Sequence, residues 1–271
     1  MKPTLDFIKT IAAQAGDILQ NFATADLNIE HKGRTDLVTQ ADHESERFLI
    51  NAIQKHFPEH AIIAEESGEW AGSQDHQWFI DPLDGTLNYA HGVPIYCVSI
   101  GYAYQGKMEL GVVYDPNRDE FFCAQRRQGA TLNGQPIHVS YFTELIDCML
   151  VTGFPNEVEN PPDDNTANFL RFNHTAQTVR RLGSAALDVV YVAAGRLDGF
   201  WEVSIYQWDI AAGSLIVEEA GGVVSDIFGG PNYMQNPPSI VCANPIIHQK
   251  MLDILDVVRE EKIRADTPSQ E

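Results

Sequence analysis

The residues of this 271-residue chain best suited to chemistry are two aspartates that follow a short apolar run, within residues 78–88. Asp81 and Asp84 can each offer carboxylate oxygen to a hard divalent cation. Pro82 fixes the backbone between them, so that Leu83 can turn its carbonyl oxygen toward the same ion. The segment therefore predicts a site for a cation that prefers oxygen ligands.

The next two residues, Gly85 and Thr86, are suited to binding an anion. Glycine lets the backbone approach a ligand without a side chain in the way. A helix that begins near Thr86 would direct free N–H groups and the positive end of its dipole toward that anion. A phosphate ester that bridges a cation and this helix terminus is the expected ligand.

Three other interpretations of this segment were weighed. An Asp-Gly-Thr turn at the end of a strand is common without any function. A calcium loop of the EF-hand type needs further acidic ligands and a late Glu, whereas residues 86–90 offer almost no oxygen donors. The aspartyl-phosphate hydrolases place their nucleophilic Asp two residues before the second Asp of the motif, and Pro82 occupies that position here. A covalent phospho-aspartate is therefore not expected.

Carboxylates recur at three further element boundaries. Glu65 and Glu66 follow an apolar strand predicted at 61–64, and open sheets bind ligands at such carboxyl ends. Asp42 and Asp209 each lie in the first turn of a predicted helix. Taken singly, the aspartates are explained by the helix dipole and the glutamates by ordinary surface charge. Together with the first pair, they favour one shared site.

The motifs of the chain, in order, are Lys32 to Asp42 (Lys-x-x-x-Asp-Leu-Val-Thr-x-x-Asp), Ala64-Glu65-Glu66-Ser67, Asp81 to Asn88, Gly111-Val112-Val113-Tyr114, Gly183-Ser184-Ala185-Ala186, Trp208 to Gly213 and Glu219-Ala220-Gly221-Gly222. In this order, over nearly the whole chain, they resemble the inositol monophosphatase family. The resemblance implies an α/β (α+β) fold, a layered αβαβα sandwich of the inositol monophosphatase and sugar phosphatase type. It also implies a homodimer and inhibition by lithium.

The resemblance implies that the cofactor is Mg²⁺, with two to three ions in each site. Glu65, Asp81 and the Leu83 carbonyl would hold the first ion. Asp81, Asp84 and Asp209 would hold the second, and a third, mostly water-ligated ion would lie near Glu65. Oxygen ligands suit Mg²⁺, and zinc is disfavoured because the sequence has neither a Cys-x-x-Cys motif nor a His pair flanking Glu at helical spacing.

The implied reaction is hydrolysis of a small phosphate monoester by metal-activated water, so that the chain is expected to be a phosphoric monoester hydrolase. In the family pattern, Asp42 hydrogen-bonds the Thr86 hydroxyl, which aligns a water that Glu65 helps to deprotonate. The residues that match substrate-binding positions of the family are Asp84, Gly85, Thr86, Gly183, Ser184, Ala185, Glu202 and Asp209.

Inositol-1-phosphate is the expected substrate, because residues 87–89 read Leu-Asn-Tyr, where relatives that act on phosphoadenosine nucleotides carry Lys and an acidic or Gly residue. Fructose-1,6-bisphosphate, histidinol phosphate or a nucleotide phosphate would suit the same chemistry and stay open as alternatives. A non-catalytic regulatory binder with the phosphatase fold is the alternative of a different class.

The formal net charge of −20, from 38 acidic and 18 basic side chains, repels phosphate esters unless cations are present. It also argues against a nucleic-acid partner, since the single basic cluster, Arg171 with Arg180 and Arg181, is small and suits structural pairing. No run of eighteen apolar residues occurs, so no membrane partner is expected. The four cysteines lack paired spacing and predict buried thiols in a cytoplasmic protein.

The elements that must position these residues divide the chain in two. An N-terminal half, 1–143, is expected to hold helices and a large antiparallel sheet with most metal ligands; a C-terminal α/β half, 144–264, completes the site, and 265–271 form a flexible tail. The stripes that predict helices are Leu5, Ile8, Ala12, Ala15, Leu19 and Phe22; Leu49, Ile53 and Phe57; Phe169, Phe172, Ala176 and Val179; and Leu187, Val190, Tyr191 and Ala194. Strands are predicted at 96–104, 108–114, 120–124, 130–139, 148–152, 199–202, 223–225 and 240–243, and a closing helix at 245–259.

Overall fold

The computed structural model describes residues 1–23, 29–31, 37–154 and 165–266. Its helices are α1 (Leu5–Ala23), α2 (Gln40–His56), α3 (Thr86–Ala90), α4 (Thr166–Thr175), α5 (Ala185–Ala193), α6 (Gln207–Glu219) and α7 (Pro245–Asp266), with a 3-10 turn η1 (Leu145–Asp147). Its strands are β1 (Ile29–His31), β2 (Leu37–Thr39), β3 (His60–Ala64), β4 (Gly68–Trp70), β5 (Ser73–Asp84), β6 (Cys97–Tyr104), β7 (Lys107–Asp115), β8 (Glu120–Gln125), β9 (Ala130–Leu132), β10 (Gln135–Pro136), β11 (Met149–Thr152), β12 (Thr178–Arg180), β13 (Gly199–Glu202), β14 (Val223–Ser225) and β15 (Ile240–Ala243).

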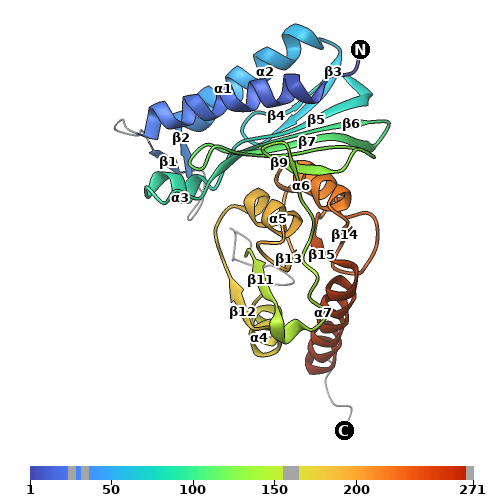
Figure 1. The fold of residues 1–271 in the computed structure, drawn as a ribbon. Coiled ribbons are helices and arrows are strands. Elements are labelled where there is room, and N and C mark those ends of the chain that lie inside the picture. The colour runs from blue at the N-terminus through green and yellow to red at the C-terminus, as the bar shows by residue number, and fades with distance from the viewer. Residues whose placement is uncertain (24–28, 32–36, 155–164, 267–271) are drawn as a thin grey trace.

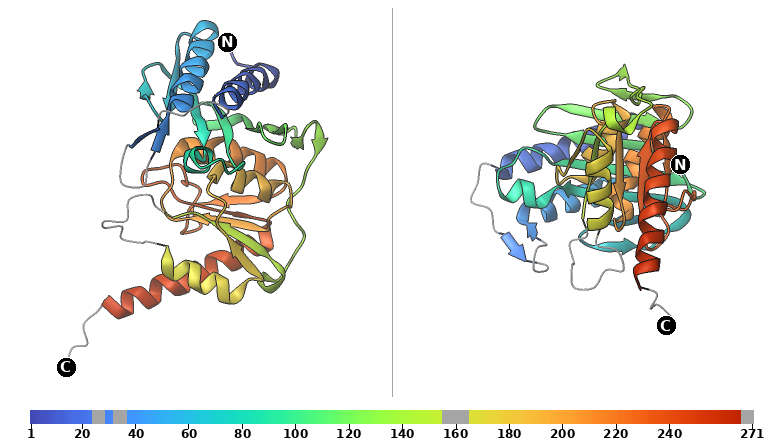
Figure 2. Two further views of the ribbon diagram at one scale, coloured as in Figure 1. Left: turned by 90° about the vertical axis from the view of Figure 1, so that its left-hand side faces the viewer. Right: turned by 90° about the horizontal axis from the view of Figure 1, so that it is seen from below.

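These elements form five layers, which confirms the predicted αβαβα sandwich. Figure 1 shows α1 and α2 above an eight-stranded sheet, α5 and α6 beneath it, then a five-stranded sheet, and α4 with α7 as the outermost layer. The left view of Figure 2 shows the same stacking from the side, and the right view looks along the stack from below, with α4 and α7 toward the viewer. Three clusters of buried apolar side chains fill the spaces between the layers.

The two helices of the first layer form as their sequences predict. The buried side of α1 is the stripe that includes Ile8, Ala12 and Leu19, which packs against the outer face of the large sheet. Helix α2 begins with a capping box. The side chain of Thr39 accepts from the Ala41 N–H, and the Asp42 carboxylate accepts from the Thr39 N–H. This cap fixes Asp42 in the first turn.

The large sheet has the strand order β10-β9-β8-β7-β6-β5-β3-β4. Every neighbouring pair in it is antiparallel except β3 and β5, so the prediction of an antiparallel sheet was wrong for this pair. Because β3 and β5 run in the same direction, their carboxyl ends meet at one edge. This parallel pairing brings Glu65, just after β3, next to Asp81 near the end of β5.

A bulge interrupts the pairing of β5 with β6. Asp81 lies opposite Ser99 and Asp84 opposite Cys97, so that two residues of β5, Pro82 and Leu83, face a single residue of β6. Bulges bend a strand and release backbone groups from the ladder, and they are common beside functional sites. Here the bulge separates the two aspartates and removes the carbonyls between them from the sheet.

Helix α6 lies between the two sheets and packs closely on the large one. Glycines of two neighbouring strands, Gly101 and Gly111, form its contact surface, and a Cβ built on Gly111 would lie 2.6 Å from the Ala212 carbonyl oxygen. The absence of side chains therefore lets the helix approach the sheet. This packing sets the position of the first turn of α6, which carries Asp209.

The small sheet has the order β12-β11-β13-β15-β14 and contains both parallel and antiparallel pairs. Its strand β12 corrects the prediction of a helical stripe through Val179: α4 ends at Thr175, Ala176 is already extended, and Val179 pairs with Leu150 of β11. Pairing with a buried neighbouring strand outweighs the local helical spacing. The stripe on α5 is confirmed up to its C-cap at Ala194.

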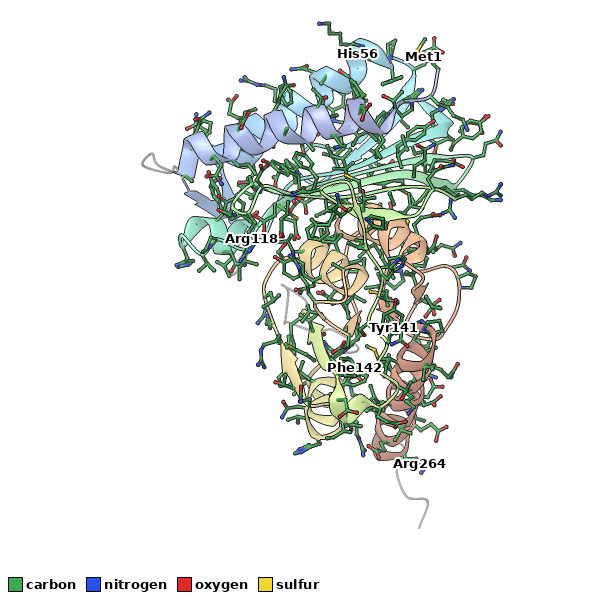
Figure 3. The ribbon with its side chains drawn as sticks, in the orientation of Figure 1. Met1, His56, Arg118, Tyr141, Phe142 and Arg264 are labelled. Atoms are coloured by element: carbon green, nitrogen blue, oxygen red, sulfur yellow. The ribbon has the colours of Figure 1, made fainter. Side chains whose placement is uncertain are left out.

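Several further predictions can be compared with the structure. Helix α7 extends through Asp266, beyond the predicted end at 259, while 267–271 lie outside the described residues. All four cysteines are free and buried, as predicted. The connection between the sheets exposes Tyr141 and Phe142 beside α7, as Figure 3 shows. The two-domain division itself stays a prediction.

The basic cluster forms local contacts. Arg171 pairs with Glu261 of α7, which confirms the predicted structural pairing for this residue. Arg180 bonds to the Thr178 side chain, and Arg181 lies over the Phe154 ring at 5.2 Å.

Substitution of Gly111, against which α6 packs, tests this contact. Gly111→Ala should lower the free energy of unfolding by about 1–3 kcal/mol, because the added methyl group overpacks a backbone contact. Chemical denaturation measures this loss. Lys107→Ala, at the exposed end of the same strand, is the control, and equal stability of Gly111→Ala and the wild type would contradict the packing argument.

Candidate metal and phosphate site

Three of the predicted metal ligands converge at one point. Asp81, Asp84 and Asp209 each offer a carboxylate oxygen, and these oxygens all lie within 4.8 Å of one another. Asp81 is 1% exposed and Asp84 is 9% exposed, while Asp209 is partly buried. Burial raises the pKa of Asp81 well above its ordinary value, and the neighbouring carboxylates Glu65, Asp84 and Asp209 raise it further. Such mutual repulsion is relieved when a cation is present.

The other two predicted ligands lie at the edge of this trio. The carboxyl of Glu65 hydrogen-bonds that of Asp81. Leu83 donates its N–H to Asp81 Oδ1 at 2.9 Å, and its carbonyl oxygen lies 3.0 Å from the Thr86 hydroxyl oxygen. The side chain of Leu83 is fully buried, so only its backbone groups contribute to the site.

Asp84 connects the carboxylate trio of Asp81, Asp84 and Asp209 to the N-terminus of α5. Its carboxylate accepts from the Ser184 hydroxyl, from the Ala185 N–H at 3.2 Å and from the Ala186 N–H at 2.8 Å. Burial raises the pKa of Asp84, and these bonds oppose that rise. Among the residues that the structure describes, Oδ1 accepts only the longer bond from Ala185, and a carboxylate oxygen has two lone pairs, so it keeps capacity for a cation. The predicted substrate contacts Ser184 and Ala185 therefore bind Asp84 in this structure.

Thr86 and Asp42 form the predicted pair. The Thr86 hydroxyl lies 2.9 Å from Asp42 Oδ1, while Asp42 Oδ2 accepts from the N–H and the hydroxyl of Thr39. Asp42 is fully buried, and desolvation raises its pKa although these hydrogen bonds oppose the rise. Asp42 is thus fixed by its own helix cap and directs its second oxygen toward Thr86.

The start of α3 packs against the loop before α5. Gly85 has φ of +96°, and a Cβ there would lie 2.8 Å from the Ile95 carbonyl oxygen, so another residue would be strained as well as crowded. Asn88 donates to the carbonyls of Ile95 and Leu182. These contacts place Gly183 beside Asn88 and thereby bring the two chain segments of the site together.

Glu202 lies at the end of β13 and is 8% exposed. Burial raises its pKa to about 8, the charge of Asp84 adds to the rise, and Arg181 opposes it. A Cβ on Gly153 would lie 2.2 Å from the Glu202 carboxylate, so glycine at that position leaves room for it. Glu202 therefore adds a further buried carboxyl group beside the carboxylate trio.

A further carboxyl group, not predicted from the sequence, lies near Asp84 and Glu202. Asp188 of α5 is 2% exposed, and among the described residues no hydrogen-bond partner lies near its Oδ1. Burial raises its pKa well above the ordinary value, with smaller contributions from Asp84 and Glu202. Its position four residues after Ser184 could have indicated that it shares a helix side with the predicted site. It was overlooked because the stripe around it is apolar.

Other supporting residues were missed as well. Thr39, Ser45 and Glu46 all belong to the start of α2 and hydrogen-bond the site or its loops. Residues 32–36 of the predicted first motif and the loop at 155–164 lie outside the described residues.

A model of the inositol monophosphatase family matches residues 1–260 of the chain. The chain belongs to the inositol monophosphatase family. It is 46% identical over 257 residues to Nus factor SuhB of Escherichia coli, covering 93% of this chain and 95% of that relative. It is 47% identical over 230 residues to inositol-1-monophosphatase of Synechocystis, covering 84% and 79% of the two chains.

Solved structures of this family share the fold. The structure of inositol monophosphatase from Anabaena superimposes with a TM-score of 0.84 at 43% identity, covering 93% of this chain and 94% of the other. The relatives thus bear two kinds of name, an enzyme name and a Nus factor name. In the part of the chain that the structure describes, no helix is both long and apolar enough to cross a membrane.

The raised pKa of Glu202 predicts how the metal-free protein responds to pH. Because the folded-state pKa of about 8 lies above the ordinary value of 4.5, stability from protonated Glu202 is present at low pH and is lost as pH rises through about 8. Relative to that of Glu202→Gln, the free energy of unfolding of the wild type should fall by up to about 1.4 kcal/mol per pH unit between the ordinary pKa of 4.5 and the folded-state pKa of about 8.

Thermal and chemical unfolding in chelator between pH 5 and 9 measures that difference. Glu260→Gln, at an exposed position of α7, controls for the substitution itself. Parallel pH curves for the wild type and Glu202→Gln would show that the Glu202 carboxylate is not destabilised by burial.

Proposed function

We propose that this chain is a magnesium-dependent phosphatase that hydrolyses a small phosphate monoester, with inositol-1-phosphate as the substrate. The observation that carries the proposal is the convergence of three carboxylates within 4.8 Å, beside a threonine hydroxyl held by a buried aspartate. Family membership and the relative named inositol-1-monophosphatase support it.

The donors at the site fit a hard divalent cation. They are carboxylate oxygens and the Leu83 carbonyl, which are the ligands that Mg²⁺ prefers. Glu65, Asp81 and Leu83 would hold one ion, and Asp84 and Asp209 would share Asp81 with a second. When bound, such ions lower the pKa of a water molecule and neutralise charge on phosphoryl oxygens.

The residues of the chain would supply the alignment. The Thr86 hydroxyl has one proton, and when it donates this proton to Asp42 its oxygen lone pairs are free to accept from a water molecule. Glu65, which lies against Asp81, would accept the proton of that water. The N–H groups of Gly85 and Thr86 would contact the phosphoryl oxygens.

The alcohol part of the substrate would contact Glu202 and the start of α5. Glu202 is buried except for 8% of its surface, and a carboxylate there can accept hydrogen bonds from hydroxyl groups. Gly183, Ser184 and Ala185 lie at the start of α5 and would line the same region. A polyol or sugar phosphate offers the hydroxyl groups that such acceptors require.

A phosphate-release assay tests the proposal. The wild type should release phosphate from inositol-1-phosphate at millimolar Mg²⁺ and should lose this activity when a chelator is added. Fructose-1,6-bisphosphate, histidinol phosphate and a nucleotide phosphate complete the panel, because they would suit the same metal site. A higher kcat/KM for one of them would reassign the substrate, and no release from any ester would contradict the proposal.

The hydroxyl of Thr86 offers a sharper test of the mechanism. Thr86→Val keeps the shape of the side chain but removes the group that aligns water, so kcat should fall by about a hundredfold or more. Thr86→Ser keeps the hydroxyl and is the matched control. Steady-state kinetics at saturating Mg²⁺ measures the effect, and a Val variant as fast as the Ser variant would remove Thr86 from the mechanism.

A non-catalytic regulatory role is the second candidate. The observation that favours it is the 46% identity to Nus factor SuhB of Escherichia coli, a relative that is not named for an enzymatic activity. This candidate predicts no phosphate release in the panel above. A homodimer, lithium inhibition, a cytoplasmic location and the lack of a nucleic-acid partner stay predictions from sequence and resemblance.

A further inference from the structure

The buried side of α2 changes in character along the helix. Its C-terminal half buries the apolar residues Leu49 and Ile53, whereas its first turns bury Asp42, Ser45 and Glu46. The spacing of three and four residues places these polar side chains on one side of the helix. Asp42 holds Thr86, as described above, but the proposed reaction gives no role to the other two.

Ser45 holds the bulge of β5. It is fully buried, and its hydroxyl donates to the Pro82 carbonyl oxygen at 3.0 Å. Pro82 lies between Asp81 and Asp84, where the bulge has removed the backbone carbonyls from the sheet. A buried carbonyl without a partner is unfavourable, so Ser45 stabilises this backbone conformation. The directions of Asp81 and of the Leu83 carbonyl both depend on it.

Glu46 holds the chain after β3. It is 4% exposed, and its Oε2 accepts from the Glu66 N–H at 2.8 Å. The preceding amide, that of Glu65, donates to the Ile80 carbonyl oxygen of β5 at 3.2 Å. The backbone at Glu65 is therefore fixed by two hydrogen bonds. Its own N–H donates to β5, and the N–H of the next residue, Glu66, donates to the Glu46 carboxylate. Bonds to a carboxylate are stronger than bonds between neutral groups.

We propose that Ser45 and Glu46 are positioning residues that set the affinity of the carboxylate site for divalent cations. The inference rests on the metal site of the proposed function. The carboxylates repel one another when no cation is bound, as the raised pKa of Asp81 indicates. By fixing the two loops from one helix, Ser45 and Glu46 hold the ligands together before the ion arrives. Without them, cation binding must also supply the free energy that orders the loops.

The experiment measures cation binding directly, in the absence of substrate. Mn²⁺ is titrated into the full chain, and the signal of the free ion is followed by electron paramagnetic resonance. Glu46→Ala should bind Mn²⁺ about 10–100-fold more weakly than the wild type, which is the usual effect of losing a group that orients a metal ligand. Glu46→Gln should bind more tightly than Glu46→Ala, because its amide oxygen still accepts from the Glu66 N–H, although through a weaker bond than that to the carboxylate.

Glu44→Ala is the matched control. Glu44 lies on the same helix, is 31% exposed and pairs with Arg47, so its loss should leave Mn²⁺ binding unchanged. Ser45→Ala removes a single hydroxyl group and should also weaken binding. Circular dichroism and thermal unfolding would reveal whether Glu46→Ala folds. If it does not, Mn²⁺ binding by Ser45→Ala tests the proposal.

The outcomes separate this inference from the proposed function. Folded Glu46→Ala or Ser45→Ala proteins that bind Mn²⁺ as tightly as the wild type would overturn the positioning role. So would a Glu46→Gln protein as weak as Glu46→Ala, since the acceptor alone would then not suffice. A wild type that binds no Mn²⁺ would instead overturn the metal site of the proposed function.

Discussion

The gathering of desolvated carboxylates at one edge of the large sheet is the constraint on which the rest of the structure depends. Burial raises the pKa values of Asp81, Asp84 and Asp209, and repulsion from neighbouring carboxylates raises those of Asp81 and Asp209 further. Buried charge of this kind is costly unless it is compensated. Part of the compensation comes from helix N-termini. Asp84 accepts from N–H groups at the start of α5, and Asp42 and Asp209 lie in the first turns of α2 and α6.

The layered architecture explains why three helix N-termini can meet there. Helix α2 comes from the layer above the large sheet, and α5 and α6 come from the layer beneath it (Figure 1). The β5 bulge lies between these layers, so groups from both sides reach the same residues. The close approach of α6 to Gly111 is part of the same arrangement, because it sets how close the first turn of α6, with Asp209, lies to the large sheet. Packing of the core and geometry of the site are thus not independent.

The acidic site has two parts with different surroundings. Within the carboxylate trio, Asp84 and Asp209 accept from backbone N–H groups at the starts of α5 and α6, whereas Glu202 lies at the end of β13 and Asp188 lies on α5. Glu202 is partly balanced by Arg181, while Asp188 Oδ1 has no hydrogen-bond partner among the described residues. The first part suits a cation, and the Glu202 part suits hydroxyl groups. That division is consistent with the polyol phosphate of the proposed function.

The amino-acid sequence by itself determined the helices with clear apolar stripes and the carboxylates at element boundaries, because these depend on local spacing and residue type. Its resemblance to a known family implied the fold class. It did not determine which elements become neighbours. The parallel pairing of β3 with β5, the strand at Val179 and the bonds of Ser45 and Glu46 to loops up to 37 residues away arise only when distant segments pack. Tertiary structure decided them, because a buried carbonyl or amide takes its partner from whichever segment folding brings near.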